Sequence, residues 1–175
     1  MARLITTKTP KPLLGIAALL TLFLFLAACG GTQAPGVVSV RISPESIKAE
    51  VGQRIVVSVN VSPEGRGISG GELALSFDPE IFTLLGVTPG GLFGSSPLVG
   101  VEAVDNQSGT LVYALARRGP TSAPTQASTF AELTFQVSGG VPAGRYALLV
   151  TRVGLADEAF RDILDIELTS TIVEL

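Results

Sequence analysis

The sequence predicts an all-β domain, an antiparallel sandwich or barrel, and three observations lead to that class. Apolar residues recur at every second position through most of the chain after Val37, which is the period of half-buried strands. Short clusters of Gly, Pro, Asn and Asp separate these runs, as in Pro142-Ala143-Gly144. No stretch of ten residues has a convincing 3.6-residue period, so we expect a sheet protein without long helices.

The alternation predicts nine strands. They are expected at 38–43, 53–62, 68–77, 81–87, 98–105, 110–117, 129–138, 145–154 and 165–174. Within them Leu73, Leu75 and Phe77 share one side and should face the core, as should Leu111, Tyr113 and Leu115. Residues 106–109 should join two strands in a hairpin. Residues 156–163 are the one place where a helical turn is expected, since Asp157-Glu158 suits a helix start.

The N-terminal segment has the parts of a secretory signal. Residues 1–12 carry three positive charges, and residues 13–28 are uncharged and almost wholly apolar. The apolar run has 16 residues, which is short for a membrane span of about 20. Leu26-Ala27-Ala28-Cys29 resembles the bacterial lipobox. The resemblance implies cleavage before Cys29, diacylation of its sulfur, and retention at an outer membrane or cell surface, because Gly30 rather than Asp follows.

We therefore divide the chain into a signal peptide at 1–28, a flexible tether at 29–36 beginning with lipidated Cys29, and one β-sandwich domain at 37–175. Three of the 12 basic residues lie in the signal, which leaves nine against 15 acidic residues and a net charge near −6. An acidic domain lacks the basic footprint of a nucleic-acid binder.

The composition also argues against catalysis. The chain has no His, which excludes Ser-His-Asp and Cys-His nucleophile systems and imidazole metal sites. Glu72, Glu102 and Glu132 lie on different expected strands, yet carboxylates on a polar strand face are usually only solvated. Acidic residues between 157 and 167 do not follow the spacing of the EF-hand calcium loop, and an acidic surface loop is the expected interpretation. We expect no enzyme activity and no cofactor or metal.

The order of the strands and turns resembles a cohesin domain. The residues that carry the resemblance are Leu-Ala-Leu-Ser-Phe-Asp-Pro-Glu-Ile-Phe at 73–82, supported by Gly-Thr-Leu-Val-Tyr-Ala-Leu-Ala at 109–116 and Ala-Glu-Leu-Thr-Phe-Gln-Val at 131–137. The resemblance covers residues 38–174. It implies a nine-stranded jelly-roll sandwich of a kind shared with bacterial carbohydrate-binding modules, and a non-catalytic role.

The resemblance also implies a docking face and a partner. In cohesins the face is the sheet whose strands have the order 8-3-6-5, and the partner is a dockerin, a small calcium-binding helical module. Carried onto this sequence, the face would present residues of the expected strands 68–77 and 110–117. They are Gly70, Glu72, Ala74, Ser76, Val112, Ala114 and Arg117. Glu72 and Arg117 would be charges at the rim, and Val112 and Ala114 the apolar centre.

Two alternatives remain open from the sequence. Residues 38–52 also resemble the opening of bacterial Ig-like repeats, which would make the chain a structural or adhesive module with about seven strands. Direct binding of polysaccharide is the other, because the fold is shared with carbohydrate modules. Sugar faces usually need exposed Trp or Tyr, and the chain has no Trp and two Tyr, Tyr113 and Tyr146, both expected in the core.

Overall fold

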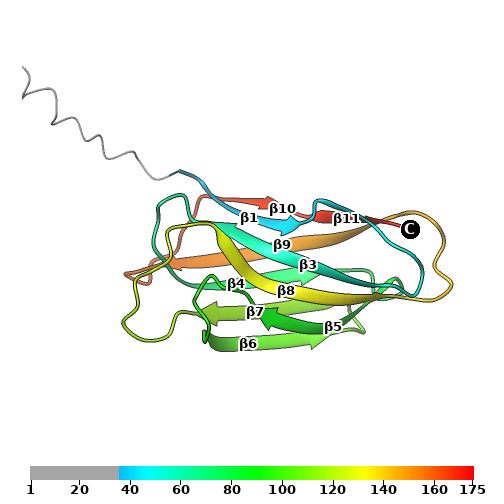
Figure 1. Ribbon diagram of the computed structural model, residues 1–175, viewed down its shortest axis with the longest axis horizontal. Helices are drawn as coiled ribbons and strands as arrows, with labels where there is room; N and C mark the ends of the chain where they lie inside the picture. The colour runs from blue at the N-terminus through cyan, green and yellow to red at the C-terminus, as the bar shows by residue number, and fades with distance from the viewer. Residues whose placement is uncertain (1–35) are drawn as a thin grey trace, which may run out of the picture. The chain divides into compact units, whose positions relative to one another are not determined.

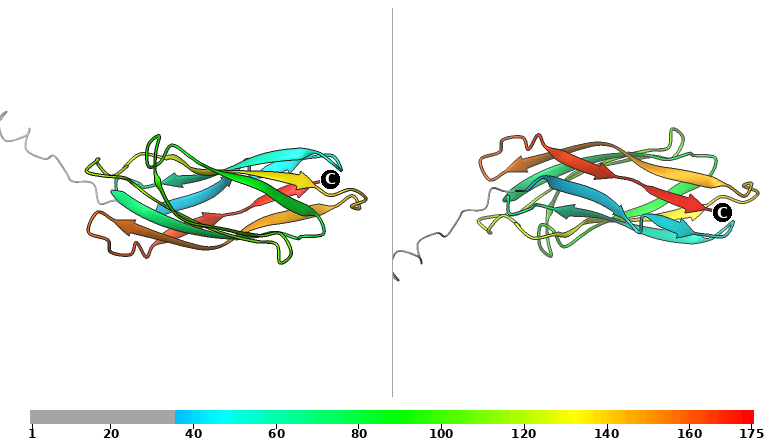
Figure 2. Two further views of the ribbon diagram at one scale, coloured as in Figure 1. Left: turned by 90° about the horizontal axis from the view of Figure 1, so that it is seen from below. Right: turned by 90° about the horizontal axis from the view of Figure 1, so that it is seen from above.

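The computed structural model describes residues 36–175, which form two β-sheets packed face to face (Figures 1 and 2). The expected signal peptide, the expected lipidation site Cys29 and all of the expected tether except Gly36 lie outside the described residues. Eleven strands make up the described part. They are β1 (Val38–Ser43), β2 (Ser46–Lys48), β3 (Arg54–Ser62), β4 (Ile68–Ser76), β5 (Phe82–Pro89), β6 (Leu98–Asp105), β7 (Thr110–Ala116), β8 (Ser128–Val137), β9 (Arg145–Asp157), β10 (Ile166–Thr169) and β11 (Thr171–Glu174).

One sheet has five strands in the order β10-β1-β3-β8-β5, and the other has six in the order β2-β11-β9-β4-β7-β6. Most neighbours are antiparallel, as the alternating sequence predicts, but β1 pairs with β10 and β11 with β2 in parallel. The all-β sandwich is thus confirmed, with eleven strands in place of the nine expected.

The two extra strands arise where the chain passes from one sheet to the other. The expected strand 165–174 divides at Ser170 into β10 of the five-stranded sheet and β11 of the six-stranded sheet. The chain makes the same change after β1, where Pro44 and Glu45 lead into β2. The two crossings are joined, because the buried Thr171 hydroxyl donates to the Pro44 carbonyl and the Ile172 amide donates to the Glu45 carbonyl.

The expected helical turn at 156–163 is wrong. Strand β9 continues to Asp157, and the chain then turns so that Asp162 forms a bridge with Ala156. The Asp157 carboxylate accepts hydrogen bonds from the Ala159 and Arg161 amides. An Asp that bonds to amides two and four residues ahead closes a tight turn as readily as it begins a helix.

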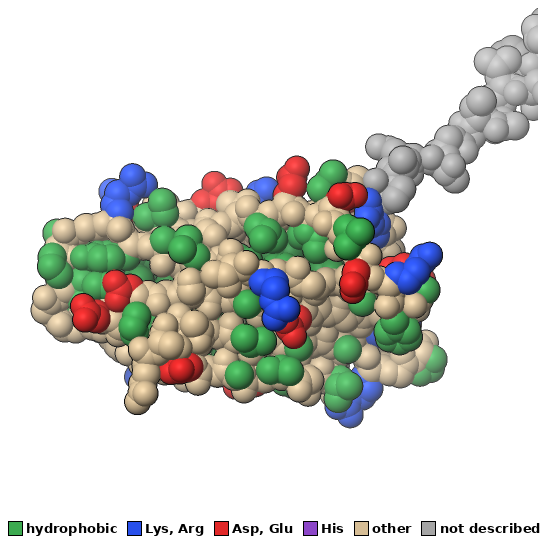
Figure 3. Space-filling model, turned by 180° about the vertical axis from the view of Figure 1, so that it is seen from behind, with side chains coloured by type: hydrophobic (Ala, Val, Ile, Leu, Met, Phe, Trp, Pro, Cys, Tyr) green, Lys and Arg blue, Asp and Glu red, His purple; other side chains and the backbone are tan. Residues whose placement is uncertain are grey.

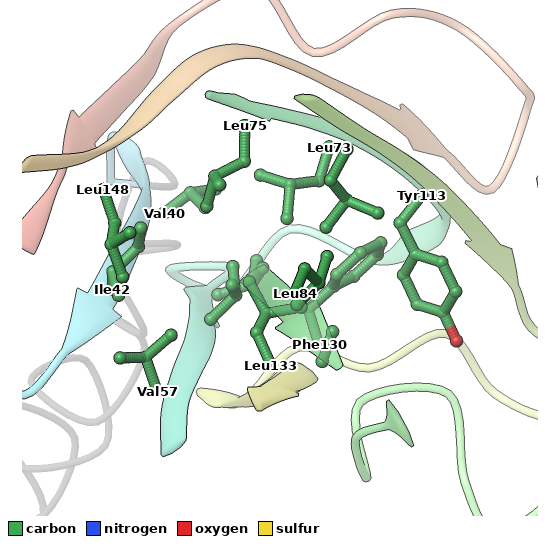
Figure 4. Close-up of a cluster of buried hydrophobic side chains, with 14 of the residues drawn as sticks. Val40, Ile42, Val57, Leu73, Leu75, Leu84, Tyr113, Phe130, Leu133 and Leu148 are labelled. Carbon is green, nitrogen blue, oxygen red and sulfur yellow. The ribbon is translucent and has the colours of Figure 1, made fainter. Parts of the chain in front are cut away.

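The core lies between the sheets and contains the residues that the alternation placed there. Leu73, Leu75 and Phe77 are at most 5% exposed, and Tyr113 is fully buried. Figure 4 shows side chains such as Leu73 and Tyr113 of the six-stranded sheet and Leu133 of the five-stranded sheet in this cluster. Four aromatic rings form an edge-to-face series at one end, Phe77 on Phe135, Phe135 on Phe82, and Phe82 on Tyr146.

The hairpin expected at 106–109 is confirmed, with Gly109 at a φ of 65°. A Cβ there would lie 2.0 Å from the Phe77 carbonyl oxygen, so only glycine fits. Asn106 has a second role, because its side-chain amide reaches the other sheet. It accepts from the Leu84 amide at 2.8 Å and donates to the Leu84 carbonyl at 3.0 Å, which links the hairpin to the edge strand β5.

Candidate docking face

Strands β9, β4, β7 and β6 stand side by side in the six-stranded sheet, in that order. They correspond to the eighth, third, sixth and fifth strands that the sequence predicted, so the order expected from the cohesin resemblance is present. We call the side of these strands that points away from the core the outer face. Its residues are Gly70, Glu72, Ala74 and Ser76 on β4; Thr110, Val112, Ala114 and Ala116 on β7; Leu149, Arg152, Gly154 and Ala156 on β9; and Leu98, Val101, Ala103 and Asp105 on β6.

The outer face is composed mainly of small and aliphatic side chains. Strand pairing sets Glu72 opposite Ala114 and Ala74 opposite Val112 at the centre. Alternate residues of β4 and β7 are buried beneath, so those on the outer face are held in a flat, regular array. Figure 3 shows the molecule from behind, where apolar side chains lie among uncharged polar side chains and backbone, and a positive and a negative side chain are in contact near the middle.

Glu72 on β4 and Arg152 on β9 form an ion pair across these two neighbouring strands. The guanidinium side chain is 67% exposed and the carboxylate side chain 36%, so solvent weakens the attraction between them. Glu72 was predicted on this face, but its predicted place at the rim is wrong, because it lies opposite Ala114 on the central strand pair. Arg152 was not predicted. Strict alternation after Leu148 and Val150 would turn Arg152 inward, but a register shift between Ala74 and Leu75 marks a bulge in β9 that returns Arg152 to the outer face.

Six of the seven predicted residues lie together on the outer face, and Arg117 does not. Strand β7 ends at Ala116, and the next position has the opposite side-chain direction. The Arg117 Nε donates to the Ser69 hydroxyl at 3.2 Å, and its guanidinium lies 3.9 Å from the Glu158 carboxylate. Its side chain is only 20% exposed. Arg117 therefore fastens the start of β4 to the adjoining loops and supplies no charge to the outer face.

Strand β6 contributes an apolar border that the sequence analysis missed. All eight of its residues are exposed because it is the edge of the sheet, and Leu98 and Val101 are 51% and 40% exposed on the outer face. Leu149 forms a similar border on β9, at 46%. The continuous apolar run around Gly100 hides this arrangement in the sequence, since a register shift between Val99 and Val101 changes which residues face out.

The two tyrosines lie away from the outer face. Tyr113 is buried, as predicted, and burial together with the nearby negative charge of Glu102 raises the pKa of its phenol. Tyr146 is half-buried against Phe82, and its hydroxyl donates to the Pro142 carbonyl at 2.9 Å. Neither ring is free to lie flat against a sugar.

Two aspartates away from the outer face, Asp105 and Asp157, stabilise turns by accepting hydrogen bonds from backbone amides. The pKa of Asp105 is lowered by hydrogen bonds from the side chain and amide of Ser108 and from the amide of Gln107. The pKa of Asp157 is lowered chiefly by the amide and guanidinium of Arg161.

Among residues 36–175 no three acidic or sulfur side chains converge in a way that could hold a metal ion. Over the same residues, no helix has the length and apolar character to cross a membrane.

A family model for the cohesin domain matches residues 40–172 of the chain. The chain belongs to the cohesin family. Cohesin domains are non-catalytic protein-interaction modules, so this cohesin is not an enzyme and acts as a protein-docking module. The match, together with the eleven strands, also decides against the Ig-like alternative.

Solved structures of low sequence identity share the fold of this cohesin. CaCohA2 from Clostridium acetobutylicum is 20% identical with a TM-score of 0.64, covering 81% of this chain and 92% of that one. The cohesin–dockerin complex Coh-OlpA–Doc918 from Clostridium thermocellum is 17% identical with a TM-score of 0.66, and the match covers 79% of this chain and 99% of that one. A non-cellulosomal cohesin from the archaeon Archaeoglobus fulgidus is 14% identical with a TM-score of 0.63, and the match covers 79% of this chain and 91% of that one. No curated protein sequence matches the chain.

Proposed function

We propose that this cohesin is exported, held by a lipid on Cys29 at the outer membrane or cell surface, and docks an exported protein of the dockerin type on its outer face. The family and the fold support a docking module, and solved neighbours include cohesin–dockerin complexes. The partner would connect the surface of the cell to the breakdown of polysaccharide, as the shared fold with carbohydrate modules suggests.

The observation that carries this proposal is the contrast between the two exposed sheet faces. The outer face presents small and aliphatic side chains with one internally compensated ion pair at its centre. The exposed face of the five-stranded sheet is instead polar, with residues such as Ser58, Asn60, Thr134 and Gln136. An interface core is depleted of uncompensated charge and carries its polar groups at the rim. The outer face has that composition.

The docking test places one charge on each sheet. We expect Ala114→Arg to abolish capture of an exported partner, because a docked interface would bury the new guanidinium without a counter-charge, a cost of about 2–5 kcal/mol. Thr134→Arg puts the same side chain on the other sheet and should leave capture unchanged. Both positions face away from the core, so far-UV circular dichroism and thermal unfolding should match the wild type.

Capture is measured by pull-down from the exported proteins of the native cell, followed by identification of the bound protein. A dockerin-type partner should be lost on chelation of calcium, because calcium shapes that module. Equal capture by the wild type and Ala114→Arg would place the site elsewhere. Retention of polysaccharide without any protein would favour direct sugar binding instead.

The anchor is tested separately. We expect Cys29→Ala to release the chain from membranes or to block its processing, since the sulfur that receives the lipid is removed. Detergent phase partitioning of fractionated cells reports both the size of the chain and its membrane retention. A variant of unchanged size that stays in the detergent phase would contradict lipidation at Cys29.

A further inference from the structure

Two side chains on one loop are far more exposed than any other large apolar residue in the described part of the chain. Phe160 is 82% exposed and Leu164 is 86%, whereas the next in order, Val56, is 55%. Both belong to the segment between β9 and β10. Solvated loops normally carry polar residues at such positions, so a pair of this kind marks a surface that meets an apolar medium or partner.

The loop holds Phe160 outward by a defined structure. Phe160 has a φ of 58°, a left-handed conformation that is uncommon for a bulky residue. Its amide donates to the Asp157 carbonyl at 3.0 Å, and the Asp157 carboxylate accepts from the amides of Ala159 and Arg161. The Arg161 guanidinium closes the turn by bonding to the same carboxylate at 2.9 Å. Several hydrogen bonds therefore fix the backbone of the loop that presents the exposed ring.

The loop lies at the end of the sandwich where the chain enters it. Val38 at the start of β1 pairs with Ile166 at the start of β10, directly after the loop. Asp157 pairs with Ile68, and the Gly36 amide donates to the carbonyl of Glu64 in the turn before that strand. Figures 1 and 2 show β1 beginning at this end and the C-terminus at the other. Val37, which is 48% exposed, adds a third apolar side chain there.

We propose that this end of the sandwich rests on a lipid surface, with Phe160 and Leu164 inserted among the headgroups. The proposal rests on the lipid anchor proposed above. Gly36 follows Cys29 by seven positions, and a flexible chain of that length spans about 15 Å. A lipid on Cys29 would hold this end, rather than the distant C-terminal end, within reach of the membrane.

The chemistry of the loop favours shallow insertion into a neutral surface. Glu158, Asp162 and Asp165 outnumber Arg161 within the loop, while Arg117 lies 3.9 Å from Glu158 and Arg66 borders the same hollow. The loop therefore carries no excess of positive charge that would draw it to anionic headgroups. Aromatic and aliphatic side chains at a headgroup boundary bind by buried apolar area. Two side chains are too few to hold a domain on a membrane, and their effect is to orient a domain that is already anchored. The long axis of the sandwich would then stand upright and the outer face would look sideways.

The test uses two features of the sequence, the single Cys and the absence of Trp. Residues 29–175 contain every strand and all of the core of the described part of the chain, and their Cys29 thiol is coupled to maleimide lipid in phosphatidylcholine vesicles. This attachment does not depend on lipidation in the cell, so failure of the proposed anchor or of docking remains a separate result. Phe160→Trp and, independently, Leu164→Trp place one reporter on the loop. Val56→Trp, at an exposed site on the five-stranded sheet, is the matched control.

We expect the tryptophan emission of the Phe160→Trp and Leu164→Trp variants to shift to shorter wavelength on coupling and to lose intensity with brominated phosphatidylcholine, while that of the Val56→Trp variant does neither. Raising the fraction of anionic lipid should not strengthen the effect. Loop reporters that keep a solvent-exposed spectrum on coupled vesicles would overturn the proposal, as would equal quenching at all three sites. Loop reporters that respond only when a captured protein is added would assign the loop to a protein interface and also overturn it.

Discussion

Phe77 offers a direct measure of how tightly the two sheets are joined. The residue follows β4, is 5% exposed, and its ring meets that of Phe135 edge-to-face at 5.2 Å between centroids. Its amide donates to the Gly109 carbonyl, so the backbone stays in place when the side chain is removed. Phe77→Ala should therefore leave a cavity rather than rearrange the chain.

We expect Phe77→Ala to lower the free energy of unfolding by about 3–5 kcal/mol, the usual cost of truncating a buried Phe. About 0.5–1.5 kcal/mol of this belongs to the edge-to-face contact. Phe77→Leu should cost less because it refills most of the volume. A double-mutant cycle of Phe77→Leu with Phe135→Leu isolates the contact energy.

The assay is denaturant titration followed by far-UV circular dichroism, with the slope of the transition compared between variants. A single domain is typically stable by about 5–15 kcal/mol, so Phe77→Ala should unfold at a clearly lower denaturant concentration. A loss below about 1 kcal/mol would mean that Phe77 is not in a packed core. The assignment of Leu73, Leu75 and Phe77 to the core side of the strand would then be wrong.

Three further predictions concern other parts of the sandwich. Gly71→Ala should destabilise the domain by about 1–3 kcal/mol in thermal or denaturant unfolding. The reason is that a Cβ at this position would lie 2.6 Å from Leu155 Cδ2 and 3.2 Å from Phe130 Cε2. The control Gly86→Ala should be close to neutral, because a Cβ there meets nothing within 4 Å. Glu72→Gln should change the free energy of unfolding by less than about 1 kcal/mol, as for an exposed ion pair. It should weaken partner capture if the Glu72–Arg152 pair fixes the register of docking. Capture equal to that of the wild type would mean that the pair is not part of the interface. The pKa of Asp157 lies below its ordinary value of 3.8, so its stabilising effect on the 157–161 turn is present above pH 3.8 and is lost as the pH falls through the lower, folded-state pKa. Hydrogen exchange at the Ala159 and Arg161 amides should show that loss, and in Asp157→Asn these amides should no longer change their protection over the same pH range.

The sequence predicts the strands and the core because both follow from alternation. Leu73, Leu75 and Phe77 on one strand and Leu111 and Tyr113 on another each face inward, as burial of one sheet face requires. The same parity placed Glu72 and Ala114 on the outer face. The strand order β9-β4-β7-β6 came from the cohesin resemblance, since alternation contains no information about which strands are neighbours.

Two of the missed features break the two-residue period. The bulge in β9 turns Arg152 outward, and the register shift in β6 turns Val101 outward. A bulge depends on how one strand fits its neighbours, which a single strand's sequence does not record. The division of the expected strand at Ser170 was also missed. The chain changes sheet there between β10 and β11, but its residues keep the alternation of a strand on both sides. Arg117 was misplaced because the prediction departed from alternation there: position 117 shares the inward direction of Leu115, not the outward direction of Ala114.

The hydrogen bonds between Asn106 and Leu84 bear on how the protein avoids self-association. Strand β5 is the outermost strand of its sheet and also carries an exposed Leu85, so its free backbone groups could template an additional strand from a neighbouring molecule. The Asn106 amide occupies both the N–H and the C=O of Leu84, as a paired strand would. A molecule arriving at this edge finds those two groups already bonded, and a continuous ladder along β5 is interrupted at that point. One polar side chain from the opposite sheet thereby blocks part of the edge at which a second copy of the domain could add a strand.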